Sequence, residues 1–440
     1  MERNAQPDRK QTGLATPTRS TRKQTQVLLV LILCGECIFS LPFHIGRYFR
    51  PLLLDVLELT NTELGDAFAL YGVVAMASYF PGGLIADRFS SRHLITLSMW
   101  ATAAGGCVLL TLPDPGLLAG LYAFWGLTTI LLFWAALFKC VRILGSETQA
   151  GRLGVLDGGR GAVSAALATL ATLIFGVTGA DGIDGGGTTA IATQSFRAIC
   201  GFYMVATSLG GLLAFRVLAN FEQDATERGT CVVAETYAPG ALIRSHGLIW
   251  QAIIVLTAYT VFKSLDYLSL YLTDVRGQTS FEASQTVTAL AWLRPVGAIA
   301  AGLLADRLSP SRVCLGLFIV LVLTFALLAG GGLVDLPFLP QGTAVIAMLG
   351  AGALCTYGLR GIYFALISET GAPRAAAGTA VGLISAVGFL PEIYVGSGAG
   401  RLLDAIPGEN GFRIFFACLA ANCLLGAIAA YRLRKHIGKD

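Results

Sequence analysis

Basic side chains interrupt several of the long apolar runs of this 440-residue chain. A charged side chain inside hydrocarbon costs about 2.5–3.5 kcal/mol on insertion scales, so each of these residues is a candidate for function. Arg294 is the strongest candidate, because no acidic residue lies close to it in the sequence and it lies near mid-depth, next to Pro295. Together these cations predict a site that binds an anion. They are Lys139, Arg160, Lys263, Arg294 and Arg360.

Two carboxylates in the same runs have a cation three residues away. Asp157 precedes Arg160, and Lys263 precedes Asp266. Residues three apart lie on one face of a helix, so each pair can also be a purely structural ion pair. Because these two carboxylates are then balanced by their neighbours, the central region is expected to carry net positive charge. An anionic ligand would balance that charge.

Two further carboxylates, Glu36 and Glu392, have no such neighbour. Each is a candidate for coupling proton movement to function, and the alternative is that each pairs with a buried arginine. Lys139 has an alternative as well, because a lysine near the end of a span can extend its ammonium to the membrane surface. No metal or cofactor is expected, since the Cys34-x-x-Cys37 spacing has no second pair of ligands nearby.

The composition indicates that membrane helices position these residues. The chain is 55% hydrophobic and 13% charged, whereas a soluble globular domain is roughly 25% charged. A helix needs about 20 predominantly apolar residues to cross a bilayer. Twelve such runs lie at 27–46, 64–86, 93–112, 117–141, 154–178, 197–219, 247–273, 281–305, 313–333, 343–367, 375–398 and 412–432.

Two short motifs occur once in each half of the chain. Gly83–Arg88 recurs as Gly302–Arg307, and Ser146–Arg152 recurs as Ser368–Arg374. Six spans in each half, with the repeated turns between them, predict an all-α membrane protein of two six-helix bundles related by a pseudo-twofold axis. The expected parts are a tail (1–26), the first bundle (27–219), a polar linker (220–246), the second bundle (247–434) and a short tail (435–440).

Lysine and arginine gather on one side of this twelve-span arrangement. The first 26 residues carry six of them, and the turns after spans 2, 4, 8 and 10 carry more. Cytoplasmic loops are enriched in these residues, so both termini are expected in the cytoplasm. The net charge of +4 then follows from topology. The lipid bilayer is the expected partner, and nucleic acid is not.

The turn at 82–92 resembles the signature of the major facilitator superfamily, which has the form Gly-x-Leu-x-Asp-Arg followed by basic residues. The copy at 302–312 matches with one extra residue around Pro310. The resemblance covers residues 27–434 and implies a carrier that alternates between two conformations, one of which this loop favours. Gly83 is expected to let a neighbouring helix approach closely. The implied gating residues are Gly83, Asp87, Arg88, Arg92, Gly302, Asp306, Arg307 and Arg312. The alternative is that the two aspartates merely end their helices.

Several segments are similar to bacterial carriers near the organophosphate–phosphate antiporters of that family. These segments are 134–139, 157–161, 259–263, 267–272 and 372–380. The antiporters place one arginine on helix 1 and another on helix 7 to bind phosphate. Here helix 7 has Lys263, and helix 1 offers His44 or Arg47 near its outer end. Lysine lacks the planar fork of a guanidinium, so the likeness implies an organic anion rather than a phosphate ester in particular.

These observations predict a secondary active transporter in the inner (plasma) membrane. It would move a small organic anion, such as a sugar phosphate, sulfonate or carboxylate, by proton symport or by anion exchange, and a single chain would suffice. Two alternatives stay open: an exporter of a drug, siderophore or metabolite, and a carrier-like sensor of a ligand. An enzyme is not expected, because no nucleophile–base set or phosphate-binding loop is evident.

Overall fold

The computed structural model describes residues 19–144, 149–179, 189–219, 221, 245–331, 342–371 and 377–437. The helices of the first half are α1 (Arg19–Cys37), η1 (Ser40–His44), α2 (Ile45–Tyr48), α3 (Arg50–Leu57), α4 (Asn61–Arg88), α5 (Ser91–Leu110), α6 (Pro115–Gly126), η2 (Leu127–Trp134), α7 (Ala135–Ile143), α8 (Gln149–Val177) and α9 (Thr189–Val217). Those of the second half are α12 (His246–Ser264), η4 (Leu265–Tyr267), α13 (Leu268–Asp274), α14 (Ser280–Ala291), α15 (Leu293–Leu308), α16 (Pro310–Gly330), α17 (Thr343–Ile362), η5 (Ala365–Glu369), α18 (Ala377–Gly388), α19 (Pro391–Ala405) and α20 (Glu409–Ile437).

The described helices confirm the predicted all-α fold with about twelve spans. Eleven helical stretches are long and apolar enough to cross a bilayer, and the pair Lys23–Cys37 and Ser40–Tyr48 makes a twelfth when taken as one span. That pair is bent by 41°, a break that the apolar pattern does not predict. Pro42 lies in the π-helical segment just beyond the break, and a proline lacks the amide donor that a regular helix needs. Most of the polar linker and of the N-terminal tail lies outside the described residues.

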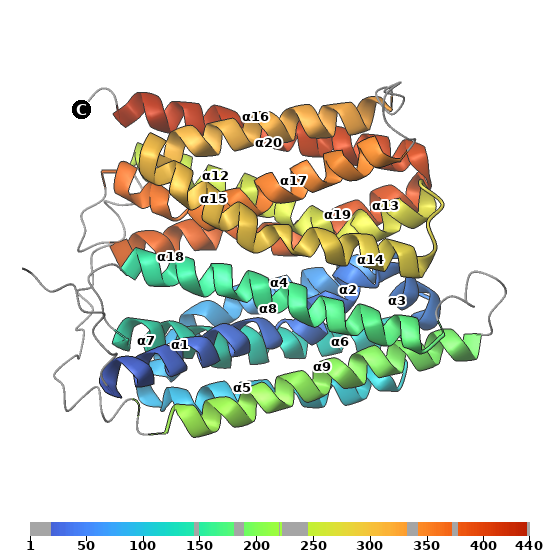
Figure 1. Cartoon of the computed structure of the whole chain (residues 1–440), viewed down its shortest axis with the longest axis horizontal. Coiled ribbons are helices and arrows are strands. Elements are labelled where there is room, and N and C mark those ends of the chain that lie inside the picture. Colours follow the sequence, from blue (N-terminus) through green and yellow to red (C-terminus); the bar gives the residue numbers. More distant parts are fainter. Residues whose placement is uncertain are drawn as a thin grey trace, which may run out of the picture.

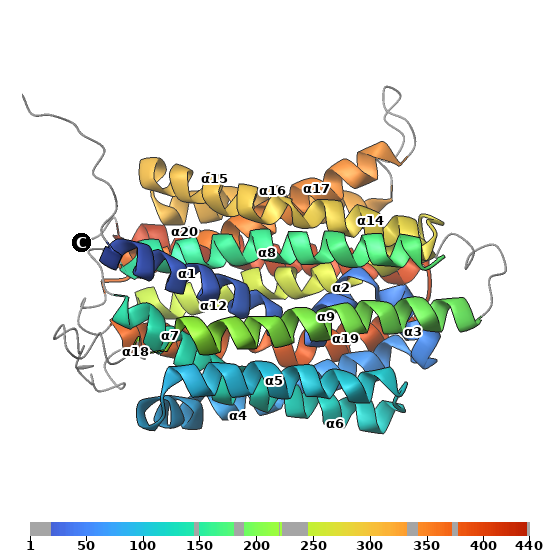
Figure 2. The same cartoon turned by 60° about the horizontal axis from the view of Figure 1, so that its bottom comes forward.

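The two halves lie side by side with their helices nearly parallel. In Figure 1 the blue-to-green helices of the first half form the lower part and the yellow-to-red helices of the second half form the upper part. Figure 2 shows the same packing from another side. The start of α1 and the end of α20 lie at the same end of the bundle. We call this the terminal end, and the other the opposite end.

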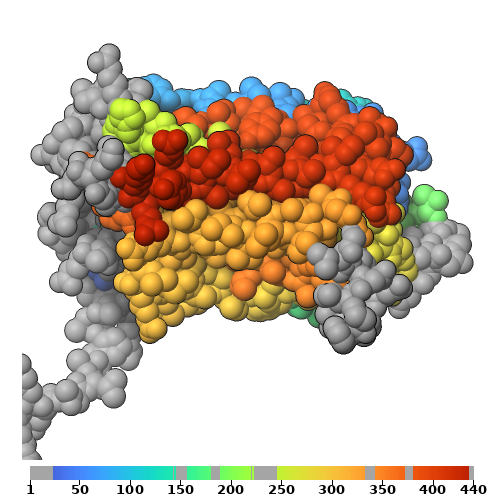
Figure 3. Space-filling view, turned by 90° about the horizontal axis from the view of Figure 1, so that it is seen from above, coloured from blue at the N-terminus to red at the C-terminus, as the bar shows by residue number. Residues whose placement is uncertain are grey.

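The outward faces of the bundle are apolar. Figure 3 shows the face over α16 (gold) and α20 (red), which pack against each other. Large hydrophobic side chains are exposed there. They include Ile319, Val320, Leu323, Leu424, Leu425 and Ile428. An apolar surface of this kind suits contact with lipid tails. Helices can lie in that environment because they satisfy their backbone hydrogen bonds internally.

Glycines allow the two halves to touch at the opposite end. A Cβ added to Gly65 of α4 would lie 2.3 Å from the carbonyl oxygen of Gly396 in α19, and one added to Gly400 would lie 2.4 Å from the carbonyl oxygen of Asn61. Only residues without a side chain permit such an approach. The start of α4 therefore packs directly on α19.

Polar contacts complete this closure. The carboxylate of Asp404 accepts the backbone N–H of Asn61 at 3.2 Å and that of Thr62 at 2.7 Å. Arg401 donates to Asp66 at 2.7 and 3.1 Å. We call these five residues the clasp. Among the described residues, the hydrogen bonds and ion pairs between the halves lie either at the centre or toward the opposite end. The structure is thus a state in which the opposite end is closed.

A valine at Gly400 should prevent this closure, because its Cβ would overlap the backbone of Asn61. We expect faster hydrogen–deuterium exchange at the start of α4 and the end of α19 in Gly400→Val than in the wild type. Gly398→Val on the same helix is the matched control, since a Cβ there meets nothing within 4 Å. Equal exchange in the two variants would contradict the assignment of Gly400 to the closure.

Candidate functional site

A cavity lies at the centre, between the two halves. It measures about 800 Å³, including the part that is open to solvent. Aromatic side chains form much of its wall, among them Trp134, Tyr259 and Phe262. Seven charged residues line it as well. They are Glu36, Arg47, Arg160, Lys263, Arg294, Arg360 and Glu392. The structure therefore brings together every cation and carboxylate named above as a substrate or proton residue, except Lys139.

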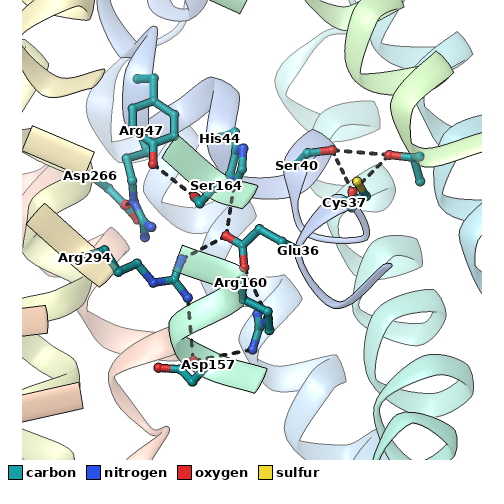
Figure 4. A network of polar contacts seen from close by, with 12 residues as sticks. Glu36, Cys37, Ser40, His44, Arg47, Asp157, Arg160, Ser164, Asp266 and Arg294 are labelled. Carbon is teal, nitrogen blue, oxygen red and sulfur yellow. Dashed lines mark hydrogen bonds and ion pairs between the residues drawn. The ribbon is translucent and has the colours of Figure 1, made fainter. Parts of the chain in front are cut away.

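Glu36 is the centre of the first charge network (Figure 4). Its Oε1 accepts from Arg294 Nη1 at 3.0 Å, and its Oε2 lies 3.2 Å from Arg160 Nε. His44 Nε2 lies 3.3 Å from Oε1. Glu36 belongs to the first half and Arg294 to the second, so this pair joins the halves. Arg294 thus has a carboxylate partner after all, but one that is distant in the sequence.

Glycines in two helices make room for these long side chains. A Cβ on Gly161 of α8 would lie 2.8 Å from Arg294 Cγ, and one on Gly35 of α1 would lie 3.2 Å from Arg160 Cδ. A larger residue at Gly161 would displace Arg294 from Glu36. Gly161 and Gly35 therefore serve the packing of the site.

Asp157 is shared by three guanidinium groups rather than paired with one. Its Oδ1 lies 3.6 Å from Arg294, 3.8 Å from Arg160 and 3.9 Å from Arg360. The expected pair with Arg160 is present, but two cations of the other half compete for the same oxygen. These separations exceed hydrogen-bonding distance, so Asp157 is held more loosely than Glu36.

A second network surrounds Lys263. Its ammonium lies 3.1 Å from Asp266, as the spacing of three residues predicts, and 3.1 Å from Glu392. Glu392 also accepts from the hydroxyl of Tyr259 at 2.6 Å. Asp266 in turn accepts from Arg47 of the first half. Arg47 is a site residue that the charge pattern alone does not single out, since it was expected near the outer end of its span.

Arg360 lies at the cavity wall with two of its guanidinium nitrogens unused. Its guanidinium lies 3.9 Å from the centre of the Phe262 ring, and neither Nε nor Nη1 has a hydrogen-bond partner. Its side chain is 14% exposed, against 6% for Arg294. A buried donor without an acceptor is costly. A ligand carboxylate in the cavity would supply that acceptor with a charge-assisted bond.

Lys139 lies elsewhere. Its ammonium donates to the carbonyl oxygens of Ala86 at 2.9 Å and Phe89 at 3.3 Å. A cation here stabilises the C-terminal end of α4, where carbonyl groups lack helical partners. Lys139 is not among the residues that line the cavity. Its expected role as a substrate ligand is corrected to that of a helix cap.

The residues of the repeated turn lie at the ends of α4 and α15, away from the cavity. Arg92 stacks on Phe215 at 3.8 Å and donates to its carbonyl oxygen at 2.8 Å. A Cβ on Gly83 or on Gly302 would meet nothing within 4 Å, so the close helix packing expected at Gly83 is absent in this state. The exposed members are Asp87, Arg88, Asp306, Arg307 and Arg312. Their gating role stays a prediction.

Two parallel helical halves that enclose a charged central cavity define a membrane carrier. The chain belongs to the Major Facilitator Superfamily, whose model matches residues 32–396. It is therefore a transporter rather than an enzyme.

Its relatives include membrane proteins of similar length. Inner membrane protein YihN of Escherichia coli is 26% identical over 435 residues, which cover 95% of this chain and 97% of YihN. Inner membrane protein YqcE of the same organism is 26% identical over 88% of this chain and 89% of YqcE. A hexuronate transporter of Bacillus subtilis is 22% identical over 79% of this chain and 81% of that transporter.

Solved structures share the fold. The D-xylose-proton symporter superposes with a TM-score of 0.69 at 14% identity, covering 93% of this chain and 96% of its own. Nucleoside transporter NupG superposes with a TM-score of 0.64 at 11% identity, covering 94% of this chain and 99% of NupG. At these identities the likeness concerns the fold alone.

Asp266→Asn should destabilise the protein, because it leaves Lys263 and Arg47 short of a buried carboxylate. Removing one partner of a buried ion pair costs about 3–5 kcal/mol, so we expect a clearly lower midpoint of thermal unfolding in detergent. Asp274→Asn, an exposed carboxylate on the same span, is the control and should unfold like the wild type. Equal midpoints for the two variants would contradict the structural role of Asp266.

Proposed function

We propose that this transporter carries a small organic anion by alternating access. The observation that supports it most is Arg360, a guanidinium at the cavity wall with two buried nitrogens that lack an acceptor. Charge supports it too. Across the two networks, the five cations Arg47, Arg160, Lys263, Arg294 and Arg360 face the four carboxylates Glu36, Asp157, Asp266 and Glu392. One further negative charge would balance the site.

The cavity favours an acid that also has a ring or hydroxyl groups. Aromatic walls can stack on a sugar ring, and the carboxylate of Glu392 can accept from hydroxyl groups. The hexuronate transporter among the relatives supports an acidic sugar. Sugar carboxylates, sulfonates and phosphates share the required charge.

Binding would exchange one carboxylate for another. Asp157 sits loosely among Arg160, Arg294 and Arg360, so the acid group of a substrate can replace it there. Arg294 and Arg360 belong to the second half, whereas Asp157, Arg160 and Glu36 belong to the first. An anion held by both halves would therefore change the contacts between them, which is what a conformational switch requires.

Coupling would follow if the bound anion also drew Arg294 away from Glu36. A carboxylate that loses its guanidinium partner inside the membrane is stabilised by taking up a proton. Glu36 is our first candidate and Glu392 the second, which makes proton symport the preferred mode and anion exchange the alternative. We further propose that the protein works as a monomer with both termini in the cytoplasm. Its place would be the inner membrane, since the relatives YihN and YqcE are named inner membrane proteins.

Uptake of radiolabelled D-glucuronate into proteoliposomes tests the substrate class. The wild type should take up glucuronate and not glucose, which has no carboxylate. Arg360→Gln should lower kcat/KM at least about tenfold, since a hydrogen bond to a charged group contributes about 1.5–3 kcal/mol. Lys139→Gln, outside the cavity, is the matched control and should keep most of the activity. Equal uptake of acid and sugar, or full activity of Arg360→Gln, would argue against an anion site at this residue.

The pH dependence tests the coupling residue. Wild-type uptake should increase when the solution outside is made more acidic than the inside, because protons then enter with the anion. Glu36→Gln, once thermal unfolding shows that it is folded despite the charge lost beside Arg160 and Arg294, should lose this response but still exchange labelled for unlabelled glucuronate, with Glu58→Gln at an exposed position as control. A pH response that persists in Glu36→Gln would remove Glu36 from the coupling step and leave Glu392 as the candidate.

A further inference from the structure

Arg50 is a buried cation that the central site does not use. It begins α3, its side chain is among the largest that are fully buried, and its residue exposure is 0%. Its Nε donates to Asn61 Oδ1 at 3.0 Å, and its guanidinium lies 4.0 Å from the centre of the Tyr267 ring. Nη1 and Nη2 have no hydrogen-bond partner. A buried guanidinium with two unused nitrogens is costly, which calls for a functional explanation.

The clasp lies directly over this residue. Asn61 accepts from Arg50 through its side-chain oxygen, and its side-chain nitrogen donates to Asp404 Oδ1 at 3.2 Å. Arg50 and Asn61 belong to the first half, whereas Asp404 and Tyr267 belong to the second. When the halves part at the opposite end, as alternating access requires, Arg50 loses the cover of Tyr267 and Asp404. Its two unused nitrogens then face the opening.

Arg50 also follows two residues of the cavity wall closely in the sequence. Arg47, three residues before it in the first span, lines the cavity and pairs with Asp266. His44, a further three residues back, lines the cavity too and contacts Glu36. Three cationic or titratable side chains thus follow one another from the closed end to the centre. A negatively charged group could contact these three side chains in turn on its way to the cavity.

We propose that Arg50 is a second anion-binding position, which holds the acid group of the substrate in the state that is open at the opposite end. In that state the planar guanidinium offers Nη1 and Nη2 to two oxygens of a carboxylate, sulfonate or phosphate. The anion then passes to Arg47 and the central cavity as the clasp closes behind it. This inference rests on the proposed transport of an organic anion.

The test measures KM for D-glucuronate separately at the two faces, in right-side-out and inside-out membrane vesicles. Arg50→Gln should raise KM at the opposite end by roughly ten- to a hundredfold, because it removes a charged hydrogen-bonding group. KM at the terminal end should change little. Arg50→Lys keeps the positive charge but lacks the planar guanidinium that can bind two oxygens, so it should raise KM less than Arg50→Gln does. Thermal unfolding of each purified variant shows that it is folded.

Asp404→Asn distinguishes this role from a merely structural one. That change weakens the clasp and leaves Arg50 in place, so it should favour the state open at the opposite end and lower KM there. Were Arg50 only a part of the clasp, Arg50→Gln would lower KM at that end in the same way. This result, or an unchanged KM, would overturn the inference and leave the proposed function intact. Absence of glucuronate uptake by the wild type would contradict the proposed function for this anion, and the inference with it.

Discussion

The ion pair between Glu36 and Arg294 is the interaction on which the rest of the structure depends. It joins the two halves at the centre of the bundle, at 3.0 Å and almost out of contact with solvent. Charges in such a place are stable only when each has a partner, which explains why the buried residues form connected networks rather than isolated pairs. It also explains the glycines at 35 and 161, since side chains there would displace the two arginines that bind Glu36.

The same constraint links binding to movement. Two kinds of contact between the halves matter most here: the central ion pairs, and the backbone packing with the clasp at the opposite end. The glycine packing of α4 on α19 gives close contact without side chains that would have to be rearranged. The central pairs can be exchanged for a ligand of the same charge, whereas the backbone contacts can only form or separate. A carrier needs both kinds of contact.

Much of this architecture could be predicted from the sequence. Apolar runs located the spans, and the repeated turns revealed the two halves. Rarity of charge in hydrocarbon singled out Arg160, Lys263, Arg294, Arg360, Glu36 and Glu392, which all line one cavity. That Glu36 pairs with a buried arginine was one of two alternatives, but which arginine it pairs with could not be predicted, because partners from distant segments leave no local pattern. Lys139 was misassigned since depth along a helix does not say which side of the helix a residue occupies. The place of Arg47 was missed for the same reason, whereas the bend in the first span was missed because the apolar pattern continues through it.

The central claim is that the cavity binds an organic anion through Arg360, two of whose buried nitrogens have no hydrogen-bond partner. The most direct measurement compares thermal unfolding of the purified protein with D-glucuronate and with D-glucose, which share a ring and differ in the carboxylate. The account predicts that glucuronate raises the midpoint, that glucose does not, and that Arg360→Gln abolishes the difference. Equal stabilisation by both sugars, or an undiminished glucuronate effect in the variant, would contradict it.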